Sequence, residues 1–161
     1  MAERSGFLIF VFVWYVIGAS LSGLSWLVSM LLSGLTLIGL PTYGLILLSS
    51  NLVTLIALAL TVVFLIKVWK VSADLKRWTD IVHSAHIINT IASLTVNAYA
   101  QTILSSTGVQ TSVPGVSAFQ IGFAVFAILV HIGFWIGIRV HLTRLERSGR
   151  ASFSAPLLGR A

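Results

Sequence analysis

The sequence predicts an all-helical integral membrane protein, a single bundle of four spans that run up, down, up and down. Three observations lead to this fold class: an apolar composition, four long apolar runs, and basic residues confined to alternate joints. The chain of 161 residues is 57% apolar and only 9% charged, whereas an average soluble domain has about 25% charged residues. So few charged side chains cannot cover the surface of a soluble domain of this length. The composition therefore excludes an ordinary soluble enzyme, a disordered tail and a nucleic-acid-binding domain.

Each of the four runs exceeds the about 20 apolar residues that cross a bilayer as a helix. Lipid also excludes open strands, because a helix is the element that satisfies its own backbone there. We expect one four-helix domain over residues 1–147 and a flexible cytoplasmic tail over residues 148–161. The joint at residues 33–42 contains two glycines and Pro41, which predicts either a loop or a broken extension of the first helix. The predicted spans are residues 6–32, 43–69, 81–104 and 117–140.

The basic residues predict the orientation. All ten lie before the first span, at the end of the second span or between it and the third, or at the end of the fourth span and beyond it. The two remaining joints contain no Lys or Arg. The positive-inside rule then places both termini on the cytoplasmic side of the membrane, which we expect to be a cell membrane or inner membrane. The net charge of +6 is explained by this insertion pattern, so we expect no nucleic-acid partner.

A polar seam follows one face of the third span. His83, His86, Thr90, Ser93 and Asn97 are spaced by 3, 4, 3 and 4 residues, which is a helical period. Polar groups turned to lipid would be unsatisfied, so the seam should face protein or water. The interpretation we favour is hydrogen bonding between helices, with partners expected at Asn51, Thr54 and Gln120. The alternative is the lining of a water-filled path or ligand cavity, formed by His86, Thr90, Ser93 and Asn97.

All four histidines lie in the last two runs, where a pair on neighbouring helices could hold haem b. At about 1.5 Å of rise per residue, His83 and His141 lie at matching depths, within a few Å of each other. His86 and His131 lie about 10 and 18 Å from the cytoplasmic helix ends, a poorer match. We therefore take His83 and His141 as the first candidate haem pair, and His86 and His131 as the second. The interpretation without a cofactor is that these rings hydrogen-bond within the bundle, and we predict no metal site.

The sequence offers few other residues that could carry out catalysis. The chain has no cysteine and four acidic residues, so thiol and paired-carboxylate mechanisms lack their residues. The chain contains no G-x-S-x-G, no H-E-x-x-H and no phosphate-binding glycine loop, and we expect it to have no catalytic activity of its own. The function we favour is a small polytopic subunit with a structural or assembly role in a larger membrane complex. Its partners would be the lipid bilayer and either other membrane subunits or further copies of itself. Two alternatives stay open: a haem b-binding or quinone-reactive anchor of a respiratory complex, and an oligomeric channel or transporter lined by the seam.

Overall fold

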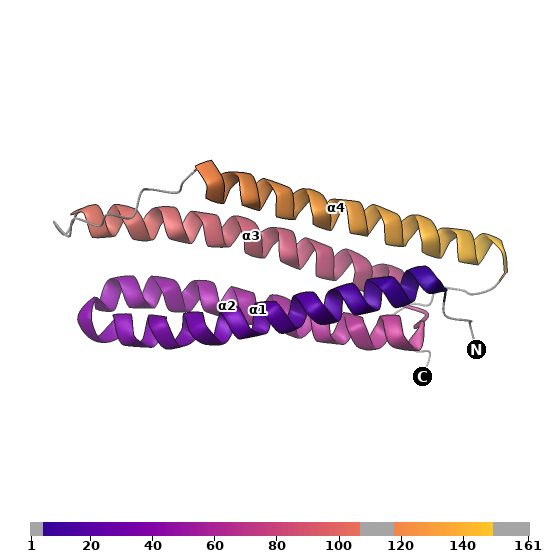
Figure 1. Ribbon diagram of the computed structural model, residues 1–161, viewed down its shortest axis with the longest axis horizontal. Helices are drawn as coiled ribbons and strands as arrows, with labels where there is room; N and C mark the ends of the chain where they lie inside the picture. Colours follow the sequence, from indigo (N-terminus) through magenta and orange to yellow (C-terminus); the bar gives the residue numbers. More distant parts are fainter. Residues whose placement is uncertain (1–4, 107–117, 150–161) are drawn as a thin grey trace, which may run out of the picture.

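The computed structural model describes residues 5–106 and 118–149, and it contains four long helices and no strand within those ranges. Successive helices run antiparallel and lie side by side (Figure 1). The all-helical fold class and the four helices are therefore confirmed. The predicted start of the fourth span at Ser117 and most of the predicted tail lie outside the described residues. The helices are α1 (Gly6–Gly39), α2 (Pro41–Lys70), α3 (Leu75–Ser106) and α4 (Ala118–Arg147).

Three of these helices, α1, α2 and α4, are long and apolar enough to cross a membrane. By the same measure α3 does not qualify, because the polar seam and the charged residues of its first turns lower its hydropathy. It nevertheless packs along both α2 and α4. That α3 also spans the membrane therefore remains a prediction, as does the orientation of the bundle.

The joint predicted at residues 33–42 is almost entirely helical. Helix α1 continues to Gly39, and only Leu40 separates it from α2. Pro41 opens α2 at the first helical position, where its missing N–H and fixed φ are no disadvantage. Both helices therefore extend past the predicted span limits at residues 32 and 43, as the broken-extension alternative expects. Gly44 makes this sharp hairpin possible, since its backbone lies directly against that of Leu37.

Replacing Gly44 by Ala should destabilise the protein by about 1 kcal/mol, because an added Cβ overpacks a tight contact. That atom would lie 2.6 Å from the Cα and 2.7 Å from the backbone nitrogen of Leu37, so the hairpin would have to open. The measurement is unfolding by SDS in mixed micelles. Gly34→Ala is the matched control, because nothing lies within 4 Å of its Cβ position. Equal stability of the two variants would contradict the close contact.

The buried apolar core lies at one end of the bundle. It joins the start of α1, the end of α2, the start of α3 and the end of α4, and its members include Leu8, Phe64 and Leu142. The same end carries three ion pairs, and we call it the basic end. The pairs are Lys67–Asp74, Lys76–Glu146 and Asp80–Arg139.

The turn from α2 to α3 is held by Asp74, which lies outside the spanning segments. Its Oδ2 accepts hydrogen bonds from Lys67 Nζ at 2.7 Å and from Trp78 Nε1 at 3.1 Å. Desolvation raises the pKa of Asp74, but hydrogen bonds, foremost that from Lys67, together with the Lys67 charge, outweigh it. The pKa of this carboxyl therefore lies below its usual value. The ion pair ties the end of α2 to the turn that begins α3.

Away from the basic end the bundle is looser. Beyond Tyr15 only Ser33 of α1 is buried, and before Ile138 only Ala124 of α4 is buried. Helix α1 meets α4 through aromatic side chains near the basic end, including Phe10 and Phe134, whose ring centroids are 6.2 Å apart. Further along, a cavity lies between these two helices.

Candidate functional site

His83 is fully buried, and both of its ring nitrogens are hydrogen-bonded. Nδ1 lies 2.7 Å from the carbonyl oxygen of Thr79. Since a carbonyl can only accept, Nδ1 carries the proton. In the neutral imidazole Nε2 is then the acceptor for the Tyr15 hydroxyl, 2.7 Å away. Tyr15 of α1 and His83 of α3 thus join two helices that are not neighbours in the chain.

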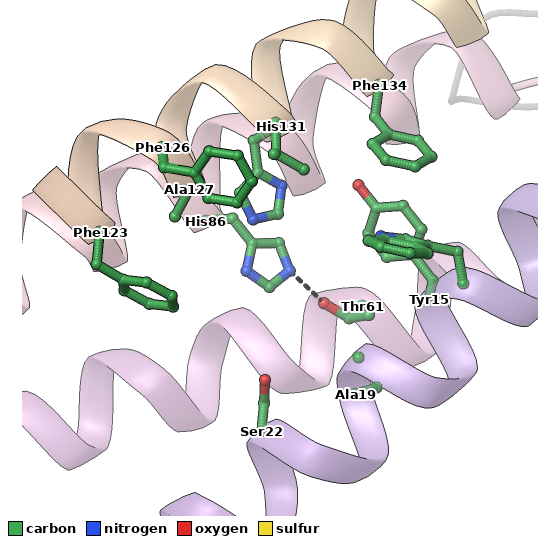
Figure 2. Close-up of a pocket in the computed structure, with 13 residues that line it drawn as sticks. Tyr15, Ala19, Ser22, Thr61, His86, Phe123, Phe126, Ala127, His131 and Phe134 are labelled. Carbon is green, nitrogen blue, oxygen red and sulfur yellow. Dashed lines mark hydrogen bonds between the residues drawn. The ribbon is translucent and has the colours of Figure 1, made fainter.

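His86 lies one turn further along α3 and bonds to α2. The Thr61 hydroxyl donates to the carbonyl oxygen of Ala57 at 2.8 Å. Its oxygen therefore accepts from Nε2 of His86, also at 2.8 Å (Figure 2). With the proton on Nε2, Nδ1 of the neutral ring carries the lone pair.

His131 of α4 stacks on His86, with 4.5 Å between ring centroids and 10° between ring planes. The depth estimate from the sequence had separated these two residues and was wrong. The register of α3 and α4 is set by Asp80, which accepts hydrogen bonds from Trp135 and Arg139, each at 2.7 Å. Because α3 and α4 run side by side away from this hydrogen bond, His86 on α3 lies opposite His131 on α4. The Nδ1 atom of His131 is buried and has no hydrogen-bond partner among the described residues.

A cavity of about 310 Å³ lies between α1 and α4 beside this histidine pair (Figure 2). Its walls are mainly aromatic, with Trp14 from α1 and Phe123, Phe126 and Phe134 from α4. Its polar lining comes from side chains on all four helices. These are Tyr15, Ser22, Thr61, His86 and His131.

His141 lies elsewhere, at the basic end. Its Nε2 is 2.7 Å from the hydroxyl of Ser5, and its ring packs against Phe7 at 4.8 Å between centroids. His83 instead bonds to Tyr15 and Thr79. The first candidate haem pair, His83 and His141, is therefore not brought together around a common space.

The second candidate pair, His86 and His131, is brought together, but not in the geometry that haem requires. Two axial histidines must hold the porphyrin between them with a nitrogen of each ring aimed at the iron. Rings stacked at 4.5 Å leave no room for a macrocycle between them. The arrangement of His86 and His131 therefore does not fit haem b.

The polar seam changes its surroundings along α3. His83 is buried, while His86, Thr90 and Ser93 are partly buried, and Asn97 is exposed. Ser93 and Asn97 line a second cavity of about 300 Å³ between α3 and α4, which Gln120 also lines. Of the partners expected on α2, Thr54 bonds to Asn89 beside the seam, at 3.1 Å. Asn51 instead donates to Ser33 on α1 at 2.9 Å.

Tyr15 and Thr61 are the two site residues that sequence reasoning missed. The same depth estimate could have found Tyr15, because it lies about 14 Å from the start of α1 and His83 about 12 Å from the start of α3. Thr61 lies about 14 Å from the last residue of α2, and His86 lies about 17 Å from the first residue of α3, both measured from the basic end. The signal that could have found both residues is a hydroxyl side chain within an apolar run, at a similar distance from the helix end as a histidine on another helix.

Among the described residues, no group of three or more His, Cys, Asp or Glu side chains could hold a metal ion. Comparison of the chain with known protein families, curated proteins and solved structures finds no match.

Proposed function

We propose that the protein is a small membrane subunit that assembles with a partner helix along the seam face of α3 and α4. The observation that carries this proposal is Asn97. Its side chain is exposed, and no hydrogen bond joins it to the described part of the chain. It lies about 14 Å from the last residue of α3. A carboxamide turned to acyl chains at that depth would lose hydrogen bonds that a neighbouring helix can supply.

The surroundings of Asn97 fit a protein partner better than lipid. The cavity beside it is lined by Ser93 and Asn97 of α3 and by Phe119, Gln120 and Phe123 of α4. Small polar side chains next to aromatic ones suit a helix that both packs closely and donates a hydrogen bond. Lipid chains could pack against the aromatic side chains, but they could not form hydrogen bonds with the polar ones.

The orientation belongs to the same proposal. The described basic residues gather at the end that carries the three ion pairs, so this end would face the cytoplasm. The seam face at Asn97 would then lie in the opposite half of the bilayer. A water path along the seam is less well supported, because the basic end is closed by buried Phe64, Val82 and Ile138.

Photo-crosslinking in native membranes tests the assembly. Benzoylphenylalanine placed at Asn97 should give a protein adduct of one defined mass, because a partner helix would lie against that position. The matched control is Ile88, which is exposed on α3 and, nine residues away, lies on the opposite helix face. There we expect lipid adducts. Lipid adducts alone at both positions would overturn the proposal.

A further inference from the structure

The cavity between α1 and α4 has a mouth that opens sideways. Trp14, Phe123 and Phe126 line it, yet they remain 49%, 64% and 63% exposed. They lie on the outward surfaces of two helices that are apolar enough to cross a membrane. A molecule would therefore reach the cavity from the lipid, and it must be soluble there.

The lining also defines the charge of such a molecule. Among the described residues that line the cavity there is no Asp, Glu, Lys or Arg. A fatty-acid carboxylate or a phospholipid head group would lack a counter-charge, and burying an unpaired charge is costly. The occupant should be neutral. The cavity volume of about 310 Å³ is at the lower end of small-molecule sites, about 300–1,000 Å³.

His131 supplies the specific polar contact. Its Nδ1 is buried without a partner among the described residues, while the ring is held against His86. The His131 ring also lines the cavity, so a ligand oxygen inside the cavity can gain a hydrogen bond from this imidazole at a prepared position. An imidazole nitrogen can present either N–H or a lone pair, depending on the tautomer. The same atom can therefore donate to a carbonyl or accept from a hydroxyl.

We propose that this cavity binds the head group of a membrane quinone or its quinol, with one ring oxygen on the imidazole of His131. A flat neutral ring fits between the aromatic side chains of α1 and α4, which stack favourably with such rings. The quinone carbonyl and the quinol hydroxyl need opposite hydrogen-bond roles, and His131 can fill both. The isoprenoid tail would leave through the mouth at Phe123 and Phe126. This cavity shares Phe123 and Ala127 with the cavity of the seam face, but Asn97 and Gln120 line only the latter.

The test is titration of the purified protein in nanodiscs with decylubiquinone, read out by quenching of tryptophan fluorescence. Trp14 lines the cavity, so binding there should give saturable quenching. His131→Leu removes the ring hydrogen bond and should weaken binding roughly tenfold. Asn97→Leu is the control outside this cavity and should bind as the wild type does. Decylbenzene, which has the tail but no oxygens and does not itself quench, should not displace decylubiquinone.

Three outcomes would overturn the inference: quenching by decylubiquinone that never saturates, displacement of decylubiquinone by decylbenzene, or unchanged binding in His131→Leu. If that variant does not fold, a photoreactive azidoquinone is used on the wild-type protein. Label that decylubiquinone displaces should then fall on peptides containing Trp14 or His131. Label spread over exposed positions such as Val62, without displacement, would contradict the site.

Discussion

Phe64→Ala is expected to lower the free energy of unfolding by about 3–5 kcal/mol, the usual cost of truncating a buried phenylalanine. Phe64 is fully buried in the core of the basic end. Its ring packs edge-on against Tyr15 and His83, at 5.2 and 6.1 Å between centroids. Within a membrane this loss is one of packing, because lipid offers no hydrophobic force between helices and van der Waals contact holds them together.

Unfolding by SDS in mixed micelles, followed by circular dichroism, measures this loss. Phe119→Ala is the control of the same residue type, since Phe119 is 80% exposed and its removal leaves no enclosed cavity. We expect it to lie within about 0.5 kcal/mol of the wild type. A Phe64→Ala variant as stable as Phe119→Ala would show that the core of the basic end does not hold the bundle together.

The fold class could be predicted because its causes are local. Apolar runs of sufficient length must become helices in lipid whatever surrounds them, and α1, α2 and α4 have that composition. The hairpin at Leu40 was harder to predict, because glycine and proline indicate a break without giving its length. Its tightness depends on the approach of Gly44 to Leu37, a contact that local composition does not reveal.

The histidines of the candidate site could be predicted from the sequence, but their hydrogen-bond and stacking partners could not. The seam spacing identified His83 and His86 from one helix. Their partners Tyr15 and Thr61 come from other helices, and the relative register of those helices decides which residues meet. That register follows from contacts such as Asp80 with Trp135, not from the ends of the apolar runs. A shift of one turn, about 5.4 Å, is enough to exchange one histidine pair for another.

Tyr15→Phe is expected to destabilise the protein by about 1–3 kcal/mol, since it leaves a buried acceptor without its donor. The phenol oxygen lies 2.7 Å from Nε2 of His83, and Nδ1 of that ring is already committed to Thr79. The ring therefore cannot turn to find another partner without losing its bond to the backbone. The aromatic packing of residue 15 against Phe64 stays in place, so the change isolates the hydrogen bond.

A double-mutant cycle with His83→Phe separates this bond from the rest of the core. If Tyr15 and His83 are paired, the two changes should be non-additive by at least about 0.5 kcal/mol, as expected for residues in direct contact. Tyr99→Phe serves as the control, because Tyr99 is 59% exposed and its loss of a hydroxyl should be nearly neutral. Additive effects of Tyr15→Phe and His83→Phe would mean that the two rings merely pack together. The bond between α1 and α3 would then contribute nothing to closing the basic end, and packing around Phe64 would have to close it alone.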